Sequence, residues 1–181
     1  MPSINPGEEK LYEYKAEFAG VWMYHCGTSP ALHHIANGMY GMMIVEPKGG
    51  LEPVDQEFAF VQSEWYLGPQ GEPASLTKAS VGAPAPDYVV FNGSVGSLTG
   101  DKALTAKVGE TVRLFVGNGG PNLVSSFHVI GEIFDSVYFE GGRRAQEDVQ
   151  TTLVPAGGSA IVDFKLDTNG SRPEVLSSLI D

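Results

Sequence analysis

The chain has 181 residues, 42% of them hydrophobic and 10% aromatic, a composition ordinary for a globular protein with a buried core. Its net charge of −11 argues against nucleic-acid binding, because phosphate contacts need clustered Lys and Arg. The same charge suits docking to an oppositely charged protein. No apolar run approaches the roughly 18 residues of a membrane helix, so we expect no membrane span.

Short apolar runs separated by Gly, Pro, Asn or Asp recur along the whole chain. Val112 and Leu114 alternate with Arg113, as in a sandwich strand with one buried side. These patterns predict an all-β protein built as a β-sandwich. The expected strands are residues 10–18, 20–26, 40–47, 57–67, 87–93, 110–118, 125–131, 136–142, 148–155 and 159–167. The two expected helical segments, both connectors, are Pro30 to Gly38 and Pro73 to Ser80.

A domain boundary is expected in PKGGLEPVDQ, Pro47 to Gln56, where two prolines and a Gly-Gly pair interrupt the strands. We take residues 49–56 as a linker and residues 57–181 as the second domain. Residues 1–48 hold three or four strands, too few to close a two-sheet core. We therefore expect the first domain to be truncated at its N-terminal side.

The stretch YHCGTSPALHHIANGM, residues 24–39, holds three of the four histidines and the only cysteine. A copper ion that exchanges one electron favours a thiolate, imidazoles and a weak thioether ligand. Cys26, His34 and Met39 are that set less one imidazole, spaced C-x7-H-x4-M. Singly, each residue type is more often structural, as a buried Cys, a core Met or a hydrogen-bonded His. Together, at a strand end, they predict a copper site.

His25 directly precedes the cysteine. Successive strand residues point to opposite faces, so His25 and Cys26 cannot easily share one metal. They can serve two. A metal on His25 would then be joined to the Cys26 copper through one short covalent path, suited to passing an electron.

Four stretches of the chain resemble segments of copper-containing nitrite reductases, particularly the branch with the shorter Cys-to-His loop. They are YHCGTSPALHHIANGMYGMMIVEPKGGL, DYVVFNGSVGSLTGD, AKVGETVRLFVGNGGPNLVSSFHVIGEIFD and VQTTLVPAGGSAIVDFK. The resemblance covers most of residues 7 to 168. It implies tandem cupredoxin domains, each a Greek-key β-sandwich, a homotrimer, and reduction of nitrite to nitric oxide with one electron and two protons. It also implies export to the periplasm and a small cupredoxin or cytochrome c as electron donor, although MPSINPGEEK shows no signal peptide.

By this resemblance, the ligands of the electron-accepting type 1 copper are Cys26, His34 and Met39. His25 matches a ligand of the type 2, catalytic copper. His128 matches a histidine that relays protons beside bound nitrite, and Ile130 matches the bulky residue that shapes the pocket over the metal. Without the resemblance, His128 in an apolar strand would more often be a core histidine, although histidine as a residue type is suited to proton delivery near neutral pH. His33 matches no ligand position and is expected to be a loop side chain.

The sequence departs from the family pattern at both ends. The family's other type 1 histidine, its proton-relaying aspartate and a second type 2 histidine lie upstream of the cysteine, whereas no histidine precedes His25 here. A third type 2 histidine follows the last shared segment, whereas none follows His128 and the chain diverges after Thr168. We therefore expect a fragment that cannot assemble the type 2 site alone and holds type 1 copper weakly, if at all.

Three alternatives stay open. A two-domain laccase needs histidines on both sides of the cysteine and roughly ten imidazoles, whereas Gly27 follows Cys26 and the chain has four histidines. An electron-transfer cupredoxin would need no metal at His25 or His128. An inert gene fragment would keep the sandwich without function.

Overall fold

The computed structural model describes residues 4–80 and 84–166. Its strands and helices are, in chain order, β1 (Gly20–His25), α1 (Ala31–Ala36), β2 (Tyr40–Val45), β3 (Gln56–Trp65), α2 (Leu76–Ala79), β4 (Tyr88–Phe91), the 3₁₀ helix η1 (Gly100–Lys102), β5 (Thr111–Gly120), β6 (Ser125–His128), β7 (Phe134–Phe139), β8 (Ala145–Val149), β9 (Thr151–Val154) and β10 (Ser159–Lys165). This set confirms the all-β prediction and both short connector helices. No helix in the described part of the chain is long and apolar enough to cross a membrane.

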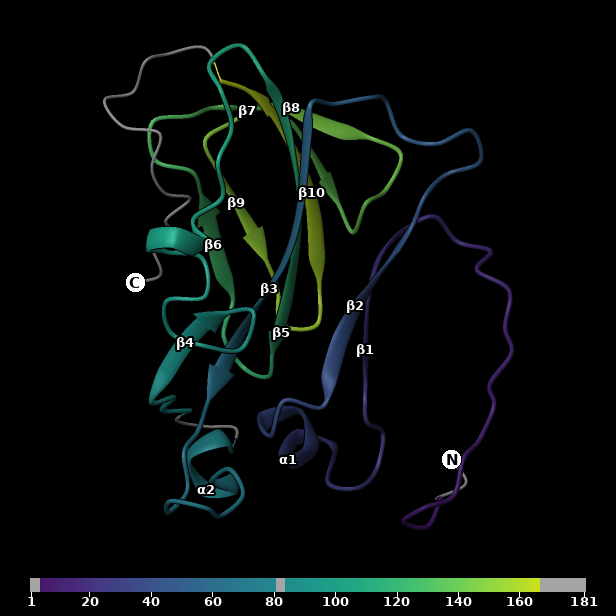
Figure 1. Cartoon of the computed structure of the whole chain (residues 1–181), viewed down its shortest axis with the longest axis vertical. Helices are drawn as coiled ribbons and strands as arrows, with labels where there is room; N and C mark the ends of the chain where they lie inside the picture. Colours follow the sequence, from purple (N-terminus) through teal and green to yellow (C-terminus); the bar gives the residue numbers. More distant parts are fainter. Residues whose placement is uncertain (1–3, 81–83, 167–181) are drawn as a thin grey trace.

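The strands form a six-stranded sheet of order β4-β3-β5-β10-β7-β8 and two two-stranded sheets, β6-β9 and β1-β2. β3 runs parallel to its neighbour β5, and the other pairs are antiparallel. The six-stranded sheet and β6-β9 enclose the main core, and we call β3 to β10 the sandwich. The β1-β2 hairpin lies on the other side of the large sheet, with α1 and α2 at one end of the molecule (Figure 1).

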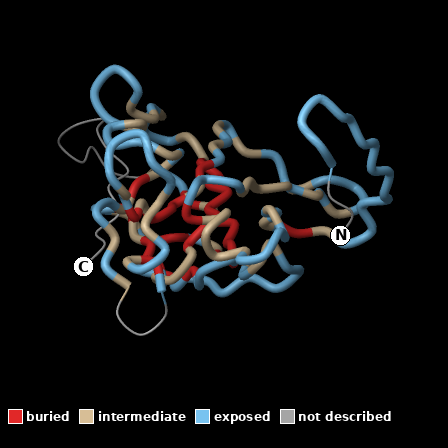
Figure 2. The backbone as a smooth tube through the Cα atoms, turned by 90° about the horizontal axis from the view of Figure 1, so that it is seen from below, coloured by how far each residue is buried: buried red, intermediate tan, exposed pale blue. Residues whose placement is uncertain are grey.

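Alternate residues of β5 face two different apolar clusters. Leu114 belongs to the main core with Phe127 of β6. Phe115, the next residue, packs with Val21 of β1 and Ile161 of β10. Because successive strand residues point to opposite faces, the hairpin and β6-β9 cover opposite faces of the large sheet. The buried residues accordingly run through the middle of the molecule (Figure 2).

Two glycines let the hairpin approach the sandwich closely. A Cβ atom on Gly117 of β5 would lie 2.8 Å from the sulfur of Met42 in β2. A Cβ on Gly20 would lie 2.6 Å from the carbonyl oxygen of Glu140, which accepts a 2.9 Å hydrogen bond from the Val21 amide. A larger side chain at Gly20 would push the hairpin away, because it would meet backbone, whereas at Gly117 the Met42 side chain would have to move.

Two expected strands differ from the structure. Residues 10–18 are exposed and outside any strand, because an alternating sequence becomes a strand only when a neighbouring backbone satisfies its hydrogen bonds. The segment 148–155 is interrupted at Gln150, so that β8 pairs with β7 in the large sheet while β9 pairs with β6. The chain passes from one sheet to the other at Gln150, between the last β8 residue, Val149, and the first β9 residue, Thr151.

Arg113 is also buried, whereas the alternation predicts only one buried side for β5. Its guanidinium donates to Asp163 at 2.7 and 2.8 Å, to Glu57 at 3.2 Å and to the Glu52 carbonyl at 2.9 Å. These bonds make burial tolerable and hold the expected linker against the sheet. The expected divergence after Thr168 lies outside the described residues.

Candidate metal centre

The connection between β1 and β2, residues 26–39, gathers the three expected type 1 ligands at one end of the hairpin. The Cys26 amide donates to the Met39 carbonyl at 2.9 Å, which continues the β1-β2 pairing past the end of β1. The Met39 amide donates to the His34 carbonyl at 3.1 Å, closing the turn after α1. As a result, His34 Nδ1 lies 3.4 Å from Met39 Sδ. We call residues 26–39 the ligand loop.

The environment of Cys26 favours its thiolate. Hydrogen bonds from the Thr28 hydroxyl and then the Thr28 amide lower the pKa of the Cys26 thiol. The residue is only partly buried, so an ion can reach the sulfur. Because the thiolate is the metal-binding form of cysteine, this arrangement prepares Cys26 for a soft metal.

The donor set of the ligand loop fits copper as three ligands of a four-ligand site. A thiolate, an imidazole nitrogen and a thioether sulfur suit a copper that changes oxidation state. Among the described residues, no three His, Cys, Asp or Glu side chains gather around one point. The described residues therefore do not place the remaining imidazole of a type 1 site beside these ligands.

His25 lies at the end of β1, exposed to solvent. Its Nδ1 is 2.9 Å from the Cys26 carbonyl oxygen, and a carbonyl can only accept, so Nδ1 carries the proton. Nε2 then presents a lone pair. Metal-binding histidines commonly use one ring nitrogen in this way while the other donates to a carbonyl.

His128 and Ile130 both face away from the main core. Phe127 and Val129, which alternate with them, are buried, whereas His128 is half-buried and Ile130 is 57% exposed. The interpretation of His128 as a core histidine is therefore wrong. Its Nδ1 donates to the Gln150 carbonyl at 2.7 Å, which leaves Nε2 as the atom that takes up a proton.

The structure does not bring His25 and His128 together. His25 belongs to the hairpin, and His128 belongs to β6 on the opposite face of the large sheet (Figure 1). One copy of the chain therefore has the ligand loop and the β6 residues on separate surfaces. A site that uses both must involve two copies.

Two residues in the ligand loop have a role that the sequence did not indicate. His33, expected to be a plain loop side chain, places Nε2 2.8 Å from the Ala74 carbonyl. Asn37 accepts the Ala74 amide at 2.9 Å. No sequence signal identifies these contacts, since Ala74 lies about 40 residues away in an irregular connection.

A family model described as multicopper oxidase matches residues 3–49, the part that contains the ligand loop. A copper-containing nitrite reductase of Neisseria gonorrhoeae is 59% identical over 171 residues, covering 92% of this chain and 43% of that relative. The chain is a homologue of copper-containing nitrite reductases. It spans less than half the length of this relative, and about half that of the nitrite reductase of Alcaligenes faecalis, to which it is 31% identical.

Solved structures agree with this nitrite reductase homology. The copper nitrite reductase of Nitrosomonas europaea superposes with a TM-score of 0.81 at 39% identity, covering 93% of this chain and 60% of that one. This neighbour confirms the cupredoxin fold. A blue copper oxidase of the same organism superposes with a TM-score of 0.73 at 26% identity. Of these two structures, the nitrite reductase is the more similar to this chain.

Proposed function

We propose that this chain is the copper-binding part of a nitrite reductase that forms nitric oxide, with full activity belonging to a longer parent protein. The observation that carries the proposal is the ligand loop, in which His34 Nδ1 lies 3.4 Å from Met39 Sδ and the Met39 carbonyl is bonded to the Cys26 amide, next to His25. The homology to copper-containing nitrite reductases over 92% of the chain supports the same function.

The proposed type 1 ligands are Cys26, His34 and Met39. A copper ion at these side chains supplies reversible one-electron chemistry. The chain contributes a short loop whose backbone hydrogen bonds tie the Met39 backbone to those of Cys26 and His34. The partly exposed Cys26 keeps the site near the surface, where an electron donor can approach.

His25 is the proposed ligand of the type 2, catalytic copper. Because it is bonded to Cys26 through one peptide unit, an electron accepted near Cys26 has a short covalent route to it. The tautomer fixed by the Cys26 carbonyl directs the free Nε2 lone pair outward, toward a metal or a neighbouring molecule.

The proposed reaction combines nitrite, one electron and two protons to give nitric oxide and water. One N–O bond breaks, and its oxygen leaves as water after taking both protons. His128 Nε2 is proposed to deliver a proton, since its Nδ1 is held by the Gln150 carbonyl and Nε2 is the ring nitrogen left for proton exchange. Ile130, on the same outward face, is proposed to limit the space above the bound nitrite.

The homotrimer that the family resemblance implies would let these two separated surfaces meet between neighbouring copies. Because His25 and His128 lie on opposite faces of the large sheet, a shared catalytic site is proposed at the contact between neighbouring subunits. The remaining type 2 imidazoles must come from parts of the parent beyond the four histidines of this chain.

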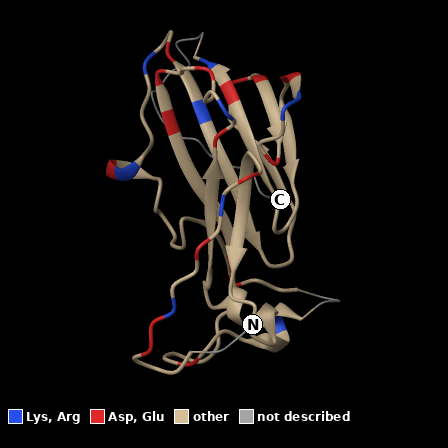
Figure 3. Ribbon diagram, turned by 90° about the vertical axis from the view of Figure 1, so that its right-hand side faces the viewer, with Lys and Arg blue, Asp and Glu red and all other residues tan. Residues whose placement is uncertain are grey.

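The proposed electron donor is a small cupredoxin or a cytochrome c. The net charge of −11 suits a basic donor, and Lys and Arg residues are scattered among acidic ones along the chain (Figure 3). We place the parent protein in the periplasm or at the cell surface, as the family resemblance implies.

The test is a titration of the purified chain with copper(II), following the thiolate-to-copper absorption band and nitrite consumption with a reduced dye. We expect colour without turnover, and loss of colour in Cys26→Ser. Binding without a thiolate band would contradict the type 1 assignment, and an inert fragment would bind no copper. Two tightly bound ions per chain with nitric oxide release would show that the chain is catalytically complete.

A further inference from the structure

Two side-chain hydrogen bonds join the ligand loop to the backbone of Ala74 in the sandwich. His33 donates from Nε2 to the Ala74 carbonyl at 2.8 Å, and the Ala74 amide donates to Asn37 Oδ1 at 2.9 Å. Asn37 Nδ2 also donates to the His33 carbonyl at 2.7 Å. Both polar backbone groups of Ala74 are thus hydrogen-bonded, its carbonyl to His33 of α1 and its amide to the C-cap residue Asn37. Asn37 is in turn hydrogen-bonded to the His33 backbone.

An apolar contact lies under these hydrogen bonds. Three fully buried residues pack against one another: Ala36 of α1, Ala79 of α2, and Tyr66, which directly follows β3. Leu32 and Ala74 are partly buried and pack against this cluster. α1 has six residues and no side-chain N-cap. A helix this short does not hold its shape alone in water, so its position is set by what it packs against.

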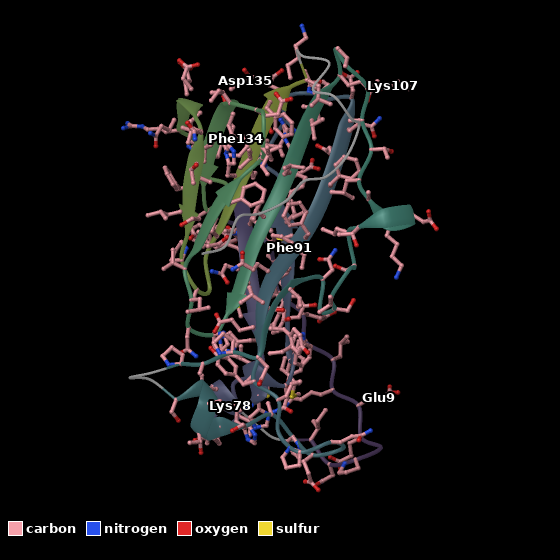
Figure 4. The ribbon with its side chains drawn as sticks, turned by 90° about the vertical axis from the view of Figure 1, so that its left-hand side faces the viewer. Glu9, Lys78, Phe91, Lys107, Phe134 and Asp135 are labelled. Atoms are coloured by element: carbon pink, nitrogen blue, oxygen red, sulfur yellow. The ribbon has the colours of Figure 1, made fainter. Side chains whose placement is uncertain are left out.

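The surface that receives α1 is itself fixed to the sandwich. Tyr66 donates its hydroxyl to the buried carboxylate of Glu64, and Asn122 Nδ2 donates to the same hydroxyl at 2.9 Å and to the Ala79 carbonyl at 2.9 Å. Glu64 also accepts the backbone amides of Asn122 and Leu123 at 3.0 and 2.7 Å. The α2 end of the molecule, marked by Lys78 in Figure 4, is therefore bonded to the connection between β5 and β6.

We propose that His33 and Asn37 are positioning residues that clamp the ligand loop to Ala74 and thereby set the spacing of the copper ligands His34 and Met39. His34 adjoins His33 in α1, and Met39 follows Asn37 by two residues. Fixing Asn37 to the sandwich therefore fixes the turn that brings Met39 Sδ to His34 Nδ1. The assignment of His34 and Met39 as copper ligands rests on the proposed function, whereas the clamp rests on the contacts alone.

The first experiment measures amide hydrogen exchange at Ala74 in the metal-free chain. Asn37→Leu removes the acceptor of the Ala74 amide, and we expect about ten-fold faster exchange, which corresponds to about 1.4 kcal/mol. Asn37→Asp keeps an acceptor oxygen for the Ala74 amide but cannot donate to the His33 carbonyl, so its exchange rate should fall between those of Asn37→Leu and the unmodified chain. Ser80→Ala removes a hydrogen bond between Ser80 and Leu76 that does not involve the ligand loop, and it should leave Ala74 unchanged. Unchanged exchange in Asn37→Leu would overturn the clamp.

The second experiment compares the copper(II) spectrum of His33→Leu and His33→Gln. Glutamine can donate an amide hydrogen to the Ala74 carbonyl, whereas leucine cannot. We expect His33→Leu to shift and weaken the thiolate-to-copper band per bound copper, and His33→Gln to restore it. A merely structural role for His33 would lower the unfolding temperature and leave the band unchanged, which would overturn the positioning role.

The two proposals fail separately. If the unmodified chain gives no thiolate-to-copper band, the proposed function fails. The contact of His33 and Asn37 with Ala74 is still tested by the metal-free measurements. In that case NMR signals of the His34 ring report its surroundings directly. A changed His34 signal in His33→Leu that is restored in His33→Gln supports the clamp, and an identical signal in all three proteins overturns it.

Discussion

The side-chain hydroxyl of Ser159 donates a 2.6 Å hydrogen bond to the backbone carbonyl of Val21, across 138 residues of sequence. Ser159 begins β10 in the large sheet, and Val21 lies in the β1-β2 hairpin, so this bond joins the part that carries the ligand loop to the sandwich. The Val21 amide is held from the same side by the Glu140 carbonyl.

We predict that Ser159→Ala destabilises the chain by about 1–3 kcal/mol, because it leaves a buried carbonyl without its partner. Urea unfolding followed by tryptophan fluorescence measures this change, since Trp22 lies in the hairpin. Ser126→Ala, at an exposed position of β6, is the matched control and should have almost no effect. Equal stability of Ser159→Ala and the unmodified chain would show that the hairpin does not depend on this bond.

Tyr66 is predicted to ionise only at very high pH. Burial, and then its hydrogen bond to Glu64, raise the pKa of the Tyr66 phenol far above its ordinary value. The pKa is higher in the folded chain than in the unfolded one, so this contribution to stability is intact below about pH 10 and is lost as the pH rises further. The tyrosinate absorbance that distinguishes the unmodified chain from Tyr66→Phe should therefore develop together with alkaline unfolding. Ionisation of Tyr66 near pH 10 in a folded chain would contradict the network.

Asp87 gives the opposite pH dependence. Hydrogen bonds from the Lys78 ammonium and then from the Leu67 amide lower the pKa of the Asp87 carboxyl. Its stabilising contribution is therefore present above the unfolded pKa of about 3.9 and is lost as the pH falls below it. We expect Asp87→Asn to be less stable than the unmodified chain at pH 6, with the difference shrinking as the pH falls through the lowered pKa of the folded chain. Asp101→Asn in η1 provides the exposed-carboxyl control, and a difference that persists in acid would disprove the linkage.

Cys26 should react faster with alkylating reagents than an ordinary cysteine at neutral pH. Because Thr28 lowers the pKa of the Cys26 thiol, more thiolate is present at a given pH. The pH at which iodoacetamide labelling of the metal-free chain reaches half its maximal rate should lie below about 8.5. Thr28→Val keeps the amide donor, removes the hydroxyl and should raise this pH. An identical profile in Thr28→Val would rule out the hydroxyl as the cause.

The strand periodicity predicted most of the sandwich because the period of two along a strand is a local property. Val112 and Leu114 were correctly predicted to face one core. Periodicity could not show that Arg113 between them is buried as well, because its partners Asp163 and Glu57 come from strands 50 and 56 residues away. Nor could alternation alone show that residues 10–18 lack a pairing strand, since pairing depends on the neighbouring chain.

The sequence by itself determined the donor set of the candidate copper site, because Cys26, His34 and Met39 lie within 14 residues and their side-chain chemistry depends only on residue type. It also identified the fold class. Only the tertiary structure decided that Ala74 holds the ligand loop through His33 and Asn37, and that β1 and β6 lie on opposite faces of one sheet. These relationships join segments distant in sequence, where burial and hydrogen bonding arise from packing and leave no local pattern.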